Sequence, residues 1–204
     1  MRTKKQRKTS SRKHFVNSLK KLYPSCKHDS ISKNYEGHKV TYGEMEYNGI
    51  ELLYKYISKK YNPNISSFID VGSGRGKLCM FMAAQPKIRK VVGIELVTDR
   101  HDDAIMLKSK LDPLYGDKVT LINSDIFKIN LQDFNLTNVF VWFSNLCFDQ
   151  NITDDIFKKL IKELPKESII CCSKQHTIPE LHLLDSIKIP MSWNSSSNVN
   201  IYRL

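Results

Sequence analysis

A glycine-rich turn followed by an acidic residue carries the clearest chemical signal in this chain. Gly72, Gly74 and Gly76 separate a short apolar stretch from a helical pattern, and the next apolar run ends at Glu95. Glycines allow a sharp turn with positive φ and leave bare N–H groups at a helix N-terminus, where the dipole favours negative charge. A carboxylate at the end of the second strand can accept both hydroxyls of a ribose. Residues 65–95 therefore predict a strand, a turn, a helix and a strand that bind a nucleoside.

The spacing of the glycines separates two kinds of nucleoside site. Dinucleotide sites usually have Gly-x-Gly-x-x-Gly after apolar residues, whereas this chain has Gly72-x-Gly74-x-Gly76 with Asp70 two residues upstream. This combination resembles the first motif of class I S-adenosylmethionine (SAM) methyltransferases. The resemblance implies that the turn lies beside the methionine part of SAM and that Asp70 positions it. The alternative is a glycine turn in a Rossmann-like fold that binds NAD or no ligand.

The hydrophobic pattern places this turn within a larger sheet. Residues 65–204 alternate strand-like and helix-like segments five times and close with two short apolar runs. They predict an α/β domain of the class I methyltransferase type, a doubly wound sheet of about seven strands with a terminal hairpin. Residues 29–64 are expected to form a cap with a cofactor-covering loop and helix. Residues 25–41, which lead into this loop, are expected to be irregular. The elements expected after Glu95 are a helix over 99–111, strands over 119–122 and 139–143, a helix over 153–164, and strands over 168–172, 187–189 and 199–202.

Two polar segments follow later strands of this sheet. Asp125 and Ile126 come after the third strand, and Ser144-Asn145-Leu146-Cys147-Phe148 follows the most apolar run. Open α/β sheets bind ligands at the carboxyl edge, where both segments fall. Resemblance to class I methyltransferases implies that Asp125 accepts from the adenine amino group and that the Ile126 N–H meets the adenine ring. The alternative for Asp125 is that it only caps a turn.

Six stretches, taken in order, resemble one family: the non-SET, Dot1-like histone H3 lysine methyltransferases of the disruptor-of-telomeric-silencing type. The resemblance covers residues 40–204. Its most particular parts are the upstream Tyr-Gly-Glu and the Asn-x-x-Phe element after the fourth strand. The six stretches are Tyr42-Gly43-Glu44, Phe68 to Gly74, Gly93-Ile94-Glu95, Asp125, Ser144 to Phe148, and Ile169 to Lys174 followed by Ser192-Trp193.

The resemblance implies a role for each matched position. The Tyr42–Met45 loop, including Glu44, would cover the methionine end of SAM, which Asp70 and the glycine turn would hold from below. Glu95 would bind the ribose. The family has two asparagines beside the transferable methyl, whereas this chain has Ser144 and Asn145, so the first catalytic contact changes. Lys77 is a second departure, since related enzymes often carry a neutral residue there, and its charge would meet the cofactor carboxylate.

Methyl transfer requires that the acceptor amine is correctly placed and removed from water. It is an in-line displacement without a covalent intermediate, and the neutral amine must lie about 3–3.5 Å from the methyl. A lysine with a pKa near 10.4 must first lose its proton, which a narrow apolar channel favours. Phe148, Trp193 and Tyr202 are the candidate walls of this channel, with plain core packing as the alternative. No general base is needed.

Chain length, apolar runs and cysteine spacing limit the class of protein. With 204 residues the chain allows one domain with a proper core, and no apolar run approaches the ~18 residues of a membrane span, so an intracellular protein without membrane contact is expected. No Cys-x-x-Cys spacing indicates zinc, and four cysteines lie in apolar segments. We therefore expect reduced core thiols and no metal site. The cysteines are Cys26, Cys79, Cys147, Cys171 and Cys172.

The net charge of +11 belongs to the N-terminal segment. Residues 1–28 hold ten basic residues and no acid, which leaves 22 basic against 21 acidic residues elsewhere. Residues 1–13 are predicted to be disordered, and a helix is expected over 15–22. Such a block binds polyanions by releasing counterions, or else it serves as a solubilising or nuclear-import tail. The candidate nucleosome or DNA contacts are Arg2, Lys4, Lys5, Arg7, Lys8, Arg12, Lys13, Lys20, Lys21 and Lys27.

By resemblance, the expected acceptor is a core lysine of histone H3 in the nucleosome, with SAM as cofactor, S-adenosylhomocysteine as product and DNA held by the basic segment. A monomer in the nucleus or on chromatin is expected, or in a host nucleus or cytoplasmic factory if so compact a unit is viral. Three alternatives stay open: a nucleic-acid methyltransferase, a methyltransferase for another protein or small molecule, and an inactive chromatin-binding module. The absence of proline from Ser144 to Cys147 counts against amino-methylation of a base.

Overall fold

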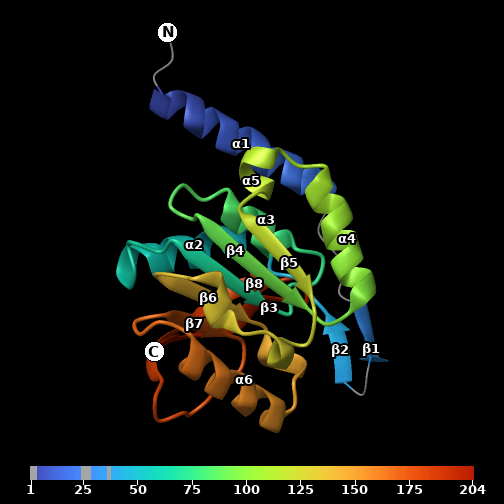
Figure 1. Cartoon of the computed structure of the whole chain (residues 1–204), viewed down its shortest axis with the longest axis vertical. Coiled ribbons are helices and arrows are strands. Elements are labelled where there is room, and N and C mark those ends of the chain that lie inside the picture. Colours follow the sequence, from blue (N-terminus) through green and yellow to red (C-terminus); the bar gives the residue numbers. More distant parts are fainter. Residues whose placement is uncertain (1–3, 24–28, 36–37) are drawn as a thin grey trace.

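A seven-stranded sheet forms the centre of the molecule, as the computed structural model of residues 4–23, 29–35 and 38–204 shows (Figure 1). Its order is β5-β4-β3-β6-β7-β9-β8, with the first five strands parallel and β9 antiparallel to both its neighbours. This confirms the doubly wound sheet with a terminal hairpin. The strands are β3 (Ser67–Val71), β4 (Lys90–Glu95), β5 (Val119–Asn123), β6 (Val139–Phe143), β7 (Ile169–Cys172), β8 (His182–Met191) and β9 (Asn194–Arg203).

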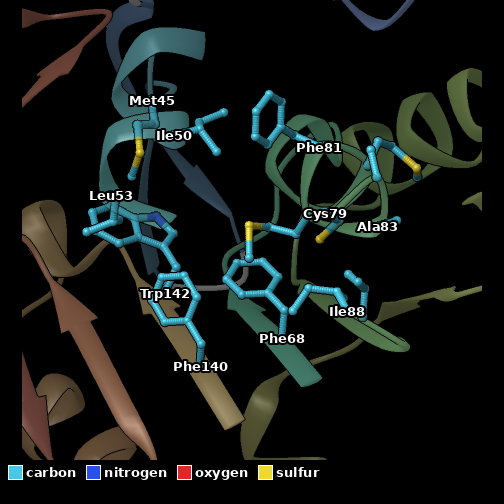
Figure 2. Packing of buried hydrophobic residues seen from close by; sticks show 14 of the residues in the cluster. Met45, Ile50, Leu53, Phe68, Cys79, Phe81, Ala83, Ile88, Phe140 and Trp142 are labelled. Atoms are coloured by element: carbon cyan, nitrogen blue, oxygen red, sulfur yellow. The ribbon is translucent and has the colours of Figure 1, made fainter. Parts of the chain in front are cut away.

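Helices cover both faces of this sheet, and each face has its own core. Successive strand residues point to opposite faces, so Phe68 packs under α3 whereas Ile69 packs toward α6. Figure 2 shows Phe68 and Phe140 pointing into the first cluster, beneath Cys79 and Phe81. The first face carries α2 (Tyr47–Lys60), α3 (Lys77–Ala83), α4 (Thr98–Ser109) and α5 (Pro113–Gly116), and the second carries α6 (Gln150–Glu163) with the short turns η1 (Ile126–Lys128) and η2 (Leu131–Phe134).

The N-terminal helix α1 (Lys4–Leu22) is longer than predicted, because residues 4–13 are helical where disorder was expected. Phe15, Leu19 and Tyr23 are buried against the first core, and the Phe15 ring lies 4.1 Å from that of Tyr115. Once this half is anchored, elongation needs no new nucleus, and the preceding Lys, Arg and Gln residues are good helix formers. The anchored half follows α3, and the other half extends past the body of the molecule (Figure 1).

Two antiparallel strands, β1 (Asp29–Tyr35) and β2 (His38–Tyr42), occupy most of the stretch that was predicted to be irregular. Their sequence gives little strand signal, since Ile31 and Val40 are their only aliphatic residues. The pair lies beside α4, where the Tyr35 hydroxyl is 2.9 Å from Thr98 Oγ1 (Figure 1). The two closing strands were likewise predicted too short, because β8 and β9 span ten residues each and include many exposed polar positions.

Three of the cysteines are buried free thiols, as predicted: Cys79, Cys171 and Cys172. Cys147 is an exception, because it is exposed at the edge of the sheet, and Cys26 lies outside the described residues. Among the described residues, no group of three His, Cys, Asp or Glu side chains is placed to hold a metal ion. In the same part of the chain, no helix is long and apolar enough to cross a bilayer.

Candidate active site

A pocket lies at the carboxyl ends of β3, β4, β5 and β6, where the parallel strands bring their terminal polar residues together. It includes thirteen of the sixteen predicted site residues, and Gly76, Asn145 and Tyr202 do not line it. The thirteen are Tyr42, Glu44, Met45, Asp70, Gly72, Gly74, Lys77, Glu95, Asp125, Ile126, Ser144, Phe148 and Trp193.

The glycine turn has the backbone geometry that its sequence predicts. Gly72, Gly74 and Gly76 have φ values of 79°, 53° and 78°, which favour glycine. A Cβ at Gly72 would meet nothing within 4 Å, so the backbone faces open space, whereas at Gly74 it would lie 2.7 Å from the Tyr42 ring. Gly76 precedes α3 and closes the turn through its N–H bond to the Ser73 carbonyl. Gly76 therefore shapes the turn and has no contact with the pocket.

Glu95 ties the glycine turn to the next strand. Its Oε2 accepts the Gly74 N–H at 2.6 Å, and its Oε1 accepts the Val97 N–H at 2.9 Å. The side chain is buried and still forms part of the pocket lining. Each carboxylate oxygen has a second lone pair. The arrangement both fixes the turn and leaves Glu95 able to accept from a ligand hydroxyl.

Asp70 is a fully buried acid with an unused oxygen. Its Oδ2 accepts weakly from the Cys79 thiol at 3.6 Å, and its Oδ1 has no partner among the described residues. Burial raises the pKa of Asp70 well above its ordinary value, and the charge of Glu95 adds to the effect. An orphaned carboxyl in a pocket wall fits a positively charged ligand group, which would satisfy the oxygen and favour its ionised form.

The roof of the pocket joins two segments that are far apart in sequence. The Ser192 N–H donates to the Glu44 carbonyl at 2.8 Å, and the Glu44 N–H donates to Ser192 Oγ at 3.0 Å. Met45 pairs with Met191, and Trp193 covers Gly43, where an added Cβ would lie 2.5 Å from the indole. The turn between β8 and β9 therefore holds the Tyr42–Met45 loop over the pocket.

Lys77 has a partner within the protein. Its Nζ lies 3.1 Å from Glu44 Oε2, with both side chains less than 10% exposed, and 4.6 Å above the Tyr47 ring. The Tyr42 hydroxyl donates to the other oxygen of Glu44. Burial, followed by the Glu44 charge, raises the pKa of Tyr42. The charge of Lys77, predicted to meet a cofactor carboxylate, is thus balanced by Glu44, and the pair locks the roof loop to α3.

The acceptor end of the pocket lies after β6, but Asn145 is not exposed to it. Asn145 is fully buried, where its Oδ1 accepts the Lys174 N–H at 2.7 Å and its Nδ2 donates to the Lys174 carbonyl at 3.3 Å. This corrects its predicted catalytic placement, because Asn145 joins the ends of β6 and β7. Ser144 and Phe148 do line the pocket, and the Phe148 ring meets Phe143 edge-on at 5.2 Å.

Tyr202 does not wall the pocket, which corrects the second predicted placement. It lies in β9 with its side chain in the core beneath α6, where its ring is 6.2 Å from that of Phe157. Its hydroxyl accepts the His176 N–H at 2.8 Å and donates to the His176 carbonyl at 3.1 Å. The alternation of side chains along β9 decides this, since it places Ile201 and Tyr202 on opposite faces.

We therefore expect Tyr202→Phe to lower stability without changing the site. Losing the hydroxyl leaves two buried backbone groups unpaired, which should lower the free energy of unfolding by about 1–3 kcal/mol. Urea unfolding measures this loss, and calorimetry should find cofactor affinity within about twofold of wild type. A large rise in acceptor KM at unchanged stability would contradict this placement.

The pocket lining also includes residues that were not predicted as site residues, among them Arg100, Phe127 and Leu146. Arg100 stacks on the outer face of the Tyr42 ring, 5.1 Å from its centroid. Phe127 and Leu146 are 46% and 41% exposed, although both line the pocket. Each follows a predicted polar residue by one to five positions, which was the available signal. Asp125 lines the pocket and also caps η1, where its Oδ1 accepts the Phe127 N–H at 3.0 Å. It can therefore cap the turn and also accept a hydrogen bond from a ligand.

The predicted polyanion contacts are only partly described. Lys13 and Lys21 are exposed on α1, Arg12 donates to Gln85 at 2.9 Å, and Lys20 lies over Tyr47. None of these four lines the pocket. The side chains of Lys4, Lys5, Arg7 and Lys8 are not described, and Arg2 and Lys27 lie outside the described residues.

The sheet order, the glycine turn and the acids at successive strand ends define a class I SAM-dependent methyltransferase. The sequence model of the family "Histone methylation protein DOT1" matches residues 24–196, and the chain belongs to this family. Its cofactor is SAM. No curated protein matches the chain in sequence.

Solved structures share the fold at low sequence identity. The methyltransferase domain of bacterial CtHen1 has a TM-score of 0.57 and 14% identity, over 76% of this chain and 97% of that one. An RNA methyltransferase from Salinibacter ruber, in complex with S-adenosylhomocysteine, has a TM-score of 0.53 and 13% identity, over 78% and 91%. The glycopeptide N-methyltransferase MtfA has a TM-score of 0.55 and 9% identity, over 76% and 95%. These likenesses show the fold alone.

The residues of the pocket fit SAM. When bound, SAM supplies a methyl group carried on a positively charged sulfur. The free oxygen of Asp70 and the open backbone at Gly72 would hold the methionine end. Glu95 would accept from the ribose, and Asp125 with the Ile126 N–H would face the adenine.

The buried acid makes a prediction about pH. A raised pKa means that folded Asp70 holds its proton more tightly than in the unfolded chain, so unfolding becomes easier as pH rises above about 4. Asp70→Asn has no such proton to lose, so the free energy of unfolding of the ligand-free variant should rise relative to wild type from pH 5 to 8. Its SAM affinity should fall at least about tenfold, because the carboxylate is lost. Thermal unfolding and calorimetry measure the two effects, with exposed Asp117→Asn as control. Equal pH profiles for wild type and Asp70→Asn would show that Asp70 is not the titrating group.

Proposed function

We propose that the protein is a SAM-dependent protein-lysine N-methyltransferase that acts on a nucleosome-core lysine of histone H3. Family membership supports histone methylation. The observation that carries the choice of an amine acceptor is an apolar wall of the pocket, formed by Leu146 and Phe148 after β6 and by Trp193 from the turn between β8 and β9. Such a wall suits the aliphatic stem of a lysine.

The wall also favours the reactive form of the acceptor. Removing an ammonium from water lowers its pKa, so the neutral amine is the form that enters apolar surroundings. The Phe148 ring packs edge-on against the buried Phe143 ring, which supports this part of the wall. Ser144 adds a hydroxyl that can accept a hydrogen bond from the amine. These residues orient the acceptor and exclude water, and no side chain is required to form a covalent intermediate.

The basic segment supports a chromatin substrate. Its ten positive charges are concentrated in residues 1–28, and α1 presents Lys13 and Lys21 to solvent on a helix anchored to the catalytic domain. We propose that this helix holds nucleosomal DNA while a monomer acts on the adjacent histone, which places the protein on chromatin. DNA contact through these residues should weaken steeply with added salt.

A nucleic-acid methyltransferase is the second candidate, and the basic segment favours it equally. Against it, the segment from Ser144 to Asp149 contains no proline and ends in an acid. A phosphate backbone would meet that acid at the pocket edge with like charge.

Transfer of labelled methyl from SAM to intact nucleosomes, free histones, naked DNA and RNA tests the proposal, with mass spectrometry to locate the label. We expect label on a core lysine of histone H3, more on nucleosomes than on free histone. Label on DNA or RNA alone would overturn the acceptor while leaving the fold and cofactor unchanged. Because Phe15, Leu19 and Tyr23 of the basic segment are buried in the core, the matching variant is Lys13→Gln with Lys21→Gln on the exposed side of α1, which should reduce nucleosome labelling more than labelling of free histone.

A further inference from the structure

Asp149 stands at the open edge of the acceptor end of the pocket. It directly follows Phe148, lines the pocket and is exposed to solvent. Resting on the proposed function, we infer that Asp149 receives the protonated amine of the acceptor at the pocket mouth and selects a cationic lysine over a nucleic acid.

The carboxylate of Asp149 is not used by the fold. Asp149 is the N-cap residue of α6, a place where aspartate usually accepts a backbone N–H, yet its side chain makes no cap hydrogen bond. Its backbone carbonyl instead accepts the Thr153 N–H at 3.0 Å and Thr153 Oγ1 at 2.9 Å. Within the described part of the chain, the carboxylate has neither a hydrogen bond nor an ion pair.

Three cations in or beside the pocket have other partners. Lys77 is paired with the buried Glu44, and Arg100 lies against the Tyr42 ring. Lys174 directs its Nζ to the Phe148 carbonyl at 3.3 Å. Asp149 is therefore left as an open negative charge at the mouth, although the chain as a whole is strongly positive.

Asp149 lies apart from the acidic residues that would hold SAM. Asp125 follows β5, Glu95 ends β4 and Asp70 lies in β3, whereas Asp149 comes after β6. The edge from β5 to β6 crosses three strand spacings, about 14 Å. Asp149 thus lies at the end of the pocket opposite Asp125 and directly follows Phe148 in the chain.

An aromatic ring followed by a carboxylate matches a lysine side chain. The stem can lie along Phe148 while the ammonium meets Asp149, before the amine gives its proton to water and enters as the neutral form. A phosphate group would meet the same carboxylate with like charge. Asp149 is a positioning and specificity residue, because it acts before the transfer and holds no reacting atom.

Hydrogen bonds fix the backbone on both sides of Asp149, so the side chain starts from a defined position at the pocket edge. The Phe148 N–H bonds to the Asn145 carbonyl at 3.3 Å, and Asn145 is itself clamped to Lys174. On the other side, the two bonds from Thr153 fix the start of α6.

Steady-state kinetics with nucleosomes test the inference on the full chain. Asp149→Asn should raise the acceptor KM about fivefold, the worth of an exposed ion pair near 1 kcal/mol, with kcat within about twofold and SAM affinity unchanged. The difference should shrink with added salt, and Asp149→Glu should restore most of the affinity. Asp155→Asn is the matched control, since Asp155 lies on the same helix and pairs with Lys158 at 2.8 Å. An unchanged KM and salt profile in Asp149→Asn would overturn the inference while leaving the proposed function standing.

A binding measurement is independent of the histone assay. In nuclear magnetic resonance titrations with n-butylammonium in the presence of S-adenosylhomocysteine, wild-type amides over 144–149 should shift, and Asp149→Asn should lose most of this response. If wild type shows no response there, or Asp149→Asn shows the same one, Asp149 does not bind an amine. If the amine binds through Asp149 but nucleosomes receive no methyl group, the proposed histone acceptor fails and the inferred amine site stands.

Discussion

Replacing Glu95 with alanine is expected to remove measurable SAM binding and to weaken the fold. Glu95 accepts two buried N–H groups, those of Gly74 and Val97, and the variant would leave both without a partner. Each unpaired group costs about 1–3 kcal/mol, so the free energy of unfolding should fall by about 2–6 kcal/mol. Because the same carboxylate holds the glycine turn in its ligand-binding shape, SAM affinity should fall more than about 100-fold.

Glu163→Ala is the matched control for this experiment. Glu163 accepts a backbone N–H from Leu131 at 2.9 Å and pairs with Lys159 at 2.6 Å, but it lies at the end of α6 and does not line the pocket. Urea unfolding and calorimetry should therefore show destabilisation without loss of SAM affinity. If Glu95→Ala binds SAM as tightly as Glu163→Ala does, Glu95 has no part in the cofactor site.

Gly43→Ala is expected to impair methyl transfer by displacing the roof of the pocket. A Cβ at Gly43 would lie 2.5 Å from both Cε3 and Cζ3 of Trp193, closer than packed atoms approach. Either the indole or the Tyr42–Met45 loop must move, and overpacking of this kind costs about 1–3 kcal/mol. Since both segments line the pocket, we expect kcat/KM to fall at least about tenfold, while the overall fold persists.

Gly116→Ala provides the comparison, because its Cβ would meet only the Lys108 side chain at 3.8 Å and 3.9 Å. This control should keep full activity and stability. Circular dichroism and steady-state kinetics on both variants separate the two cases. Full activity in Gly43→Ala would mean that the contact between Gly43 and Trp193 is unnecessary for the site.

The dependence of the roof on distant segments explains why these effects are large. Glu44 and Ser192 are 148 residues apart, yet two hydrogen bonds join them above the pocket. The Lys77–Glu44 pair then fastens the same loop to α3 in buried surroundings, where removing one partner leaves an uncompensated charge. A local change in any of the three segments is thus transmitted to the cofactor end of the pocket.

Much of the fold and the pocket position of thirteen predicted residues follow from the sequence because their signals are local. The strand, glycine turn and helix over 65–95 come from apolar runs and from positive-φ positions that only a few neighbouring residues decide. Parallel strands bring their carboxyl ends to one edge, so Glu95, Asp125 and Ser144 could be placed together by counting strands.

Side-chain direction and pairing required the tertiary structure. Asn145 lies between two pocket residues in sequence but its side chain bonds to the Lys174 backbone, and Tyr202 bonds to the His176 backbone inside the core. The charge of Lys77 is balanced by Glu44 from another segment. Likewise, β1, β2 and the first turns of α1 form in stretches with little apolar pattern.

Local sequence thus determined which residues end the strands and where the chain must turn, because backbone conformation and hydrophobic period depend on near neighbours. The partner of each buried polar group was decided only when distant segments packed together, since a donor bonds to whichever acceptor the completed fold brings within about 3 Å. This is why the sequence could bring the strand-end residues to one pocket, whereas the hydrogen bonds that hold the Tyr42–Met45 loop to Ser192 and Asn145 to Lys174 could not be predicted.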